Sequence, residues 1–177
     1  RAGVTPDRSH LASMGVYLFA WSTLKELLAH TDSKDFGREV IPHAIHDRKV
    51  FSHFFDGYWE DIGTIDAYFE ANMAFLAEPS PAILRDPGWP IRTYKPQYPP
   101  AYVAGGTIRN SILSPGVSLS GGRVENSILS PGVRISDRAE VHDSILFEGV
   151  EVGRGAKLEK VIVDKFSVIP DKFEIGL

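Results

Sequence analysis

Two neighbouring carboxylates, Glu60 and Asp61, are the strongest candidates for chemistry in this 177-residue sequence. They lie in the run Gly57-Tyr-Trp-Glu-Asp-Ile-Gly-Thr64, between an expected strand and an expected helix, where α/β sheets tend to hold ligands. Alternation along a strand points the two side chains to opposite faces, so only one would face a site. A carboxylate acts on phosphates through a cation such as Mg²⁺, which takes one or two carboxylates plus phosphate oxygens. The alternative is that Asp61 or Thr64 only caps the following helix.

The elements expected around this pair suggest an α/β segment. The apolar run 14–20 predicts a buried strand, and Ser22 is expected to cap a helix that ends near His30. Residues 49–59 predict two strands joined by a turn. Two further helices are expected, at 36–45 with Asp35 as its cap and after Thr64 with an apolar face of Ile65, Tyr68, Phe69, Met73 and Leu76.

A short repeat fills the C-terminal part of the chain. Residues 110–117 return letter for letter at 126–133 and, degraded, at 143–150. The central isoleucines follow one another at steps of 16, 17 and 17 residues: Ile112, Ile128, Ile145 and Ile162. Aliphatic residues recur every four to eight positions, which predicts a parallel β-helix with three short strands per coil. We expect these aliphatics, the isoleucines included, to pack against the coils above and below.

Composition separates the α/β segment from the β-helix and argues against nucleic acid and membrane partners. Residues 79–100 hold seven prolines and predict an extended linker, which Trp89, Tyr94 and Tyr98 are expected to pin to one domain. The predicted domains are therefore 1–78, the linker 79–100, and a β-helix at 101–177. A net charge of −4 without a basic stripe argues against nucleic acid. The sequence has no cysteine, which suits a cytoplasmic protein, and no apolar run of about 18 residues for a membrane span.

Four runs carry a resemblance to a known family: 12–19, 35–42, 57–73 and 89–94. They closely resemble glucose-1-phosphate adenylyltransferase (ADP-glucose pyrophosphorylase), in that family's order and at its approximate spacing. The resemblance implies the C-terminal part of a Rossmann-like α/β nucleotidyltransferase domain, followed by the family's left-handed β-helix. Because the chain opens on Arg1 and stops inside what looks like another coil, we expect a piece of a longer protein.

The resemblance also implies a reaction and its residues. ATP and glucose 1-phosphate would give ADP-glucose and pyrophosphate for glycogen or storage-glucan synthesis. Asp61 looks like one of two aspartates that hold the catalytic Mg²⁺, Ser13 like a contact to glucose 1-phosphate, and Trp59 like a wall of the sugar pocket. The family also implies a homotetramer and regulation by phosphorylated metabolites. Four lysines could serve an effector site, although solvated lysines on turns explain them better: Lys157, Lys160, Lys165 and Lys172.

The sequence departs from the family in what it lacks. The Gly-rich nucleotide loop, the second metal aspartate and the phosphate-binding lysine belong to the family's N-terminal half, and no Gly-x-Gly-x-x-Gly occurs in this chain. A backbone cradle binds the triphosphate in such folds, so the chain alone is expected to be inactive. Two alternatives stay open: a mannose-1-phosphate guanylyltransferase-like pyrophosphorylase, and a non-catalytic regulatory or oligomerisation subunit. The presence of Asp61 counts against the second alternative.

Overall fold

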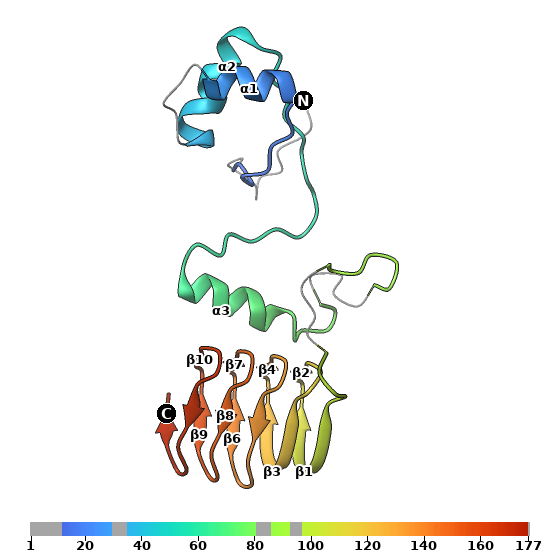
Figure 1. The fold of residues 1–177 in the computed structure, drawn as a ribbon, viewed down its shortest axis with the longest axis vertical. Coiled ribbons are helices and arrows are strands. Elements are labelled where there is room, and N and C mark those ends of the chain that lie inside the picture. The colour runs from blue at the N-terminus through green and yellow to red at the C-terminus, as the bar shows by residue number, and fades with distance from the viewer. Residues whose placement is uncertain (1–11, 30–34, 81–85, 93–96, 177) are drawn as a thin grey trace. The chain divides into compact units, whose positions relative to one another are not determined.

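The computed structural model describes residues 12–29, 35–80, 86–92 and 97–176 (Figure 1). Contacts divide the chain between Trp59 and Glu60 into two compact units, which we describe separately. The predicted limits at residues 78 and 100 rest on composition and stay predictions.

The described part of the first unit is helical. It contains α1 (Trp21–Ala29), the π-helix η1 (Phe36–Val40) and α2 (Ile41–Asp47). Its small core buries Leu27, Val40 and Ala44, against which Phe19 and Phe36 pack. Asp35 caps η1 as predicted, since its Oδ1 accepts the Arg38 N–H at 2.8 Å. The predicted helix 36–45 is thus a π turn followed by an α-helix that has Pro42 in its first turn, where a missing N–H costs nothing.

Two strand predictions for the first unit are wrong. Residues 14–20 are irregular, with Val16 and Leu18 exposed, and residues 49–59 form no hairpin. Strand propensity records how well a side chain packs on a pleated neighbour, and no strand lies among the described residues 12–29 and 35–59. Helix α1 begins at Trp21, so Ser22 lies inside it, and His30 falls outside the described residues.

Helix α3 (Ile65–Ala74) belongs to the second unit. Thr64 is its N-cap as predicted, because the Thr64 hydroxyl accepts the Ala67 N–H at 3.1 Å. Of the predicted apolar face, Tyr68, Phe69 and Met73 are half-buried, whereas Ile65 is exposed.

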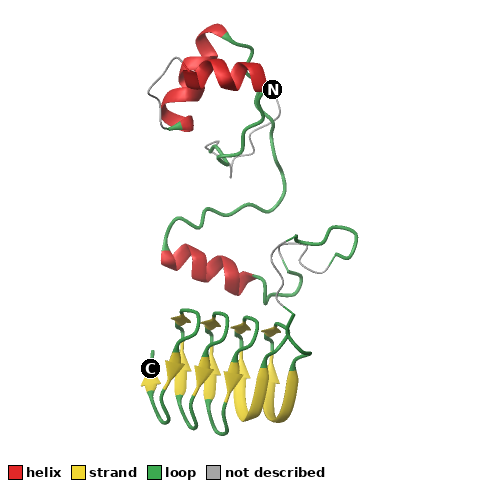
Figure 2. Ribbon diagram, viewed as in Figure 1, coloured by secondary structure: helices red, strands yellow, loops and turns green. Residues whose placement is uncertain are grey.

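The rest of the second unit is a parallel β-helix (Figure 2). Its strands are β1 (Tyr102–Arg109), β2 (Ile112–Leu113), β3 (Ser118–Glu125), β4 (Ile128–Leu129), β5 (Arg134–Ile135), β6 (Glu140–His142), β7 (Ile145–Leu146), β8 (Glu151–Val152), β9 (Lys157–Glu159), β10 (Ile162–Val163), β11 (Val168–Ile169) and β12 (Glu174–Ile175). One sheet has the order β10-β7-β4-β2, and the other runs β11-β8-β5-β3-β6-β9-β12 with β1 beside β3. Strand β3 turns a corner and pairs with both β5 and β6, so each full coil presents three strands, as predicted.

The repeat register is confirmed, and the isoleucines stack on the coils above and below as predicted, but outside the interior cluster. Ile112, Ile128, Ile145 and Ile162 stack in register, and so do Leu113, Leu129, Leu146 and Val163. The leucine row joins the interior cluster, in which Leu129 and Leu146 are fully buried. Because successive strand residues point to opposite faces, the isoleucines lie on the other face of this sheet. We call this row, Ile112, Ile128, Ile145 and Ile162, the isoleucine ladder.

The linker is tied to the β-helix by Tyr98. Its hydroxyl donates a hydrogen bond to Glu148 Oε1 at 2.8 Å. Its ring lies over two turn glycines: a Cβ added at Gly116 or Gly132 would lie 2.7 or 2.8 Å from it. The predicted pinning is therefore confirmed for Tyr98. Trp89 is 80% exposed, and Tyr94 lies outside the described residues.

Candidate functional site

Asp61 is an exposed carboxylate at the end of an irregular segment. The backbone between α2 and α3 has no helix or strand, and it ends at the N-cap Thr64. Asp61 Oδ1 lies 3.4 Å from the point where a Cβ on Gly63 would stand, so the side chain folds back toward Gly63. No hydrogen bond or ion pair links Asp61 to any other described residue. Since Thr64 supplies the cap, the carboxylate of Asp61 is left available for a ligand.

Ser13 lies in a turn of the first unit. Its Oγ accepts the Gly15 N–H at 3.2 Å and lies 3.2 Å from the Tyr17 hydroxyl. Gly15 has a φ of +70°, which a side chain would make costly, so the turn needs glycine there. Tyr17 in turn stacks on Phe36, with ring centroids 6.0 Å apart, and this contact ties the turn to the helical core.

Trp59 is the last residue of the first unit and is 40% exposed. It lies two residues before Asp61 in the irregular segment. The structure thus assigns Ser13 and Trp59 to one unit and Asp61 to the other. Their convergence on one ligand stays a prediction.

A site for Mg²⁺ stays a prediction, and the described residues can be tested for whether they fit such an ion. Among the described residues, no group of three or more His, Cys, Asp or Glu side chains is placed to hold a metal. Mg²⁺ commonly keeps several waters and binds one or two carboxylates plus substrate phosphates, so one unpaired carboxylate is a suitable partial donor set. Asp61 is the residue that would hold the ion, together with donors from elsewhere.

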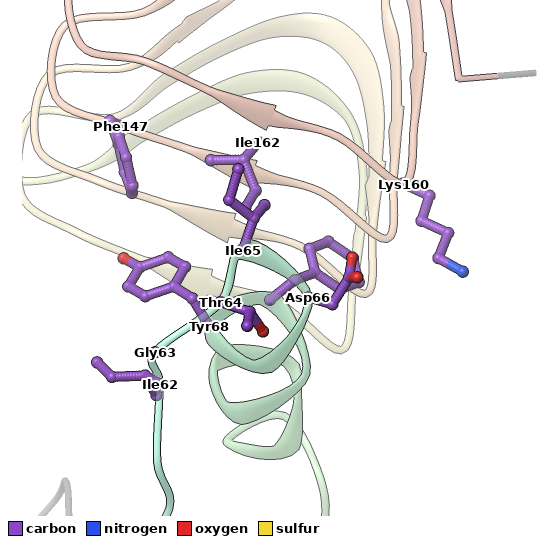
Figure 3. A pocket seen from close by; sticks show the side chains of 10 residues that line it. Ile62, Gly63, Thr64, Ile65, Asp66, Tyr68, Phe147, Lys160 and Ile162 are labelled. Carbon is purple, nitrogen blue, oxygen red and sulfur yellow. The ribbon is translucent and has the colours of Figure 1, made fainter.

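A largely apolar hollow of about 730 Å³ lies between the start of α3 and the β-helix (Figure 3). Its lining comes from both elements: Ile62, Gly63, Thr64, Ile65, Asp66, Tyr68, Phe69, Phe147, Lys160 and Ile162. The rings of Tyr68 and Phe147 meet edge to face at 6.2 Å. Sequence reasoning missed Phe147, although the repeat carried the signal: Phe147 stands where the two preceding copies have Ser114 and Ser130.

Ion pairs cross the outer face of the larger sheet. The hydrogen bond from Arg123 to Glu125, 2.8 Å long, holds the pKa of Glu125 below its ordinary value and raises that of Arg123. A hydrogen bond to Glu174 at 2.9 Å likewise raises the pKa of Lys157. Lys157 therefore already has an anionic partner, while Lys160 lines the hollow beside α3.

Comparison with known families gives the class of each part. Residues 4–78 match the nucleotidyl transferase family, and residues 100–177 match the GlmU-like C-terminal hexapeptide family. The chain therefore combines a segment similar to nucleotidyl transferases with a parallel β-helix that matches the predicted hexapeptide-repeat type. None of the described helices is long and apolar enough to cross a bilayer.

Three individual relatives indicate which nucleotidyltransferases this chain is similar to. Glucose-1-phosphate adenylyltransferase 2 of Vibrio cholerae is 45% identical over 192 residues, which cover 97% of this chain and 47% of that protein. The glucose-1-phosphate adenylyltransferases of Fervidobacterium nodosum and Thermomicrobium roseum are 40% and 45% identical, over 96% of this chain and 42% and 41% of their own lengths. The resemblance inferred from the motifs is thus confirmed: the chain is homologous to glucose-1-phosphate adenylyltransferases along nearly all of its length. It spans less than half of the length of these relatives.

Proposed function

We propose that this chain is the C-terminal part of an enzyme that makes ADP-glucose and pyrophosphate from ATP and glucose 1-phosphate. The observation that carries the proposal is the 45% identity to the Vibrio cholerae enzyme over 97% of the chain. The names of the three relatives, each a glucose-1-phosphate adenylyltransferase, favour this reaction over the guanylyl alternative. The product would serve glycogen or storage-glucan synthesis in the cytoplasm.

In this reaction a phosphate oxygen of glucose 1-phosphate attacks the α-phosphorus of ATP. The new P–O bond forms as the bond to the β-phosphate oxygen breaks, and pyrophosphate leaves. Such a transfer depends on positioning and charge stabilisation more than on a protein nucleophile. A bound Mg²⁺ would offset the negative charge that collects on the phosphates.

Three residues of this chain would take part. Asp61 would supply a carboxylate oxygen to the ion, supported by its exposure and by the lack of a partner among the described residues. Ser13 would donate its hydroxyl proton to glucose 1-phosphate, and the turn at Gly15 would hold that hydroxyl in place. Trp59 would form one wall of the sugar pocket, where an aromatic face suits the apolar side of a sugar ring.

The chain alone is proposed to be inactive and to work within a larger assembly. It spans 47% of the Vibrio cholerae relative and contains no Gly-rich phosphate loop. We further propose a homotetramer that responds to phosphorylated metabolites, as the family implies.

The test is pyrophosphate release by the full-length protein that contains this chain. ATP, GTP, UTP and dTTP are each paired with glucose 1-phosphate and with mannose 1-phosphate in the presence of Mg²⁺, and the 177-residue chain runs alongside. Turnover with ATP and glucose 1-phosphate alone, and none in the short chain, is the expected result. Preference for GTP and mannose 1-phosphate would move the specificity to the guanylyl alternative. A full-length protein inactive with every pair would favour the non-catalytic subunit.

A further inference from the structure

The isoleucine ladder is an apolar strip on the outside of the β-helix. The outward face of such a sheet usually carries polar residues, because one face of each strand packs inward and the other meets water. Helix α3 lies along this sheet, beside β10, β7, β4 and β2 (Figure 1). Ile145, in the middle of the ladder, is only 2% exposed. The burial of Ile145 agrees with a helix that covers this face, and Ile162 lines the same hollow as the start of α3.

One aromatic contact fixes α3 on this surface. Tyr68, in the first turn of the helix, meets Phe147 edge to face at 6.2 Å with an interplanar angle of 80°. Figure 3 shows the two rings facing each other, Tyr68 from α3 and Phe147 from the β-helix. The same position carries Ser114 and Ser130 in the two preceding coils, so a coil does not need an aromatic residue there to fold. The ring of Phe147 therefore packs against α3 and is not required for the fold of its own coil.

Asp61, the carboxylate proposed to hold the metal, lies just before the start of α3. Thr64 fixes the first turn through its hydrogen bond from Ala67, and Asp61 precedes it by three residues. Asp61 belongs by its contacts to the unit that contains the β-helix and not to the preceding helical unit. A displacement of the first turn of α3 would therefore carry the Asp61 carboxylate with it.

We propose that the β-helix positions Asp61 through α3, with Phe147 and Tyr68 as the positioning residues. This inference rests on the proposed function for the role of Asp61, but the docking of α3 stands by itself. The β-helix is then part of the machinery that places a ligand for the metal, in addition to any part in assembly. The hollow leaves the first turn of α3 with little other support, since Ile65 is 78% exposed.

The experiment replaces Phe147 with serine in the full-length protein, which copies the other coils. Edge-to-face pairs contribute about 0.5–1.5 kcal/mol, so hydrogen exchange in peptides within residues 60–72 should accelerate about two- to tenfold. The Mg²⁺ concentration for half-maximal pyrophosphate release should rise by a similar factor, while the KM for glucose 1-phosphate stays unchanged. Phe147→Tyr, which keeps the ring, should restore both values. Phe173→Ala is the matched control, because Phe173 is a partly exposed aromatic residue of the last coil that does not line the hollow.

The exchange measurement tests the docking of α3 independently of the enzyme assay, and the Mg²⁺ requirement tests whether that docking places Asp61. Unchanged exchange in Phe147→Ser, or an equal acceleration in Phe173→Ala, would overturn the positioning role. Faster exchange without any change in the Mg²⁺ requirement would also overturn it, because α3 would then dock without placing the carboxylate. If the wild-type protein releases no pyrophosphate, the proposed function fails, and the exchange in residues 60–72 still shows whether Phe147 holds α3.

Discussion

A column of serines lies inside one corner of the β-helix, and its hydrogen bonds predict how much stability the substitution Ser127→Ala would cost. Ser127 Oγ accepts the Ser144 N–H at 3.1 Å and donates to the Glu125 carbonyl at 2.7 Å. Ser127 and Ser144 are both 0% exposed, so water cannot replace the hydroxyl. The Glu125 carbonyl would keep its second partner, the Asp143 N–H, at 3.1 Å. Ser127→Ala would therefore leave one buried N–H, that of Ser144, without a partner.

A buried unsatisfied donor costs about 1–3 kcal/mol, and we expect Ser127→Ala to destabilise the chain by that amount. In a chain of this size each kcal/mol lowers the melting temperature by about 2–4 °C, so the expected loss is about 2–12 °C. The assay is thermal and urea unfolding followed by circular dichroism. Hydrogen exchange at the Ser144 amide should accelerate more than exchange in α3.

Ser111→Ala is the matched control for Ser127→Ala. Ser111 occupies the same position one coil earlier, and its Oγ accepts the Ser127 N–H at 3.1 Å. The Ser111 side chain is partly exposed, so water can take its place, and the loss should be smaller than for Ser127→Ala. Equal losses for the two variants, or no loss for Ser127→Ala, would refute the reasoning that an unpaired buried N–H sets the cost.

Three further predictions concern the β-helix. Gly132→Ala should lower the free energy of unfolding by about 1–2 kcal/mol, because Gly132 has a φ of +73°. The added Cβ should also displace the Tyr98 ring and make the linker more sensitive to protease, and an unchanged cleavage rate would contradict the pinning of the linker by Tyr98. Leu129→Ala should destabilise the chain by about 2–5 kcal/mol in urea, since Leu129 is fully buried, and a loss below about 1 kcal/mol would contradict that burial. The pKa of Glu125 is depressed in the folded state, so its contribution to stability is complete above the ordinary pKa of about 4.3 and is lost as the pH falls through the folded-state value. The melting temperature of Glu125→Gln should therefore fall less than that of wild type between pH 5 and about pH 3. Equal falls in the melting temperatures of the two proteins would contradict this prediction.

The β-helix could be predicted from the sequence because its signal is periodic. The steps between the isoleucines fix which strands pair, and the pairing Ile112–Ile128–Ile145–Ile162 has the predicted register. Which neighbour of each pair faces inward could not be predicted, because isoleucine and leucine are both apolar and a one-residue choice reverses the face. The contact that ties α3 to this side of the β-helix, between Tyr68 and Phe147, joins residues about eighty positions apart, so no local pattern could predict it.

Outside the repeat, features set by local hydrogen bonds could be predicted from the sequence, and features that need a distant partner could not. Asp35 and Thr64 were predictable as caps because a cap depends on a local hydrogen bond, from Arg38 and Ala67 respectively. The strands at 14–20 and 49–59 were not, since a strand needs a partner and the sequence does not say whether one is present. The role of Asp61 was inferred from its motif and stays a prediction, whereas the contact of Phe147 with Tyr68 joins two elements and could not be predicted from the sequence.

The most direct test of the account compares Asp61→Asn with Glu60→Gln in the full-length protein, with ATP, glucose 1-phosphate and a series of Mg²⁺ concentrations. Removing one preorganised electrostatic group from such a site costs about a hundredfold or more in kcat. The account predicts that loss for Asp61→Asn at every Mg²⁺ concentration, with Glu60→Gln close to wild type. Wild-type turnover in Asp61→Asn, or the larger loss in Glu60→Gln, would contradict the assignment of Asp61 as the carboxylate that holds the metal.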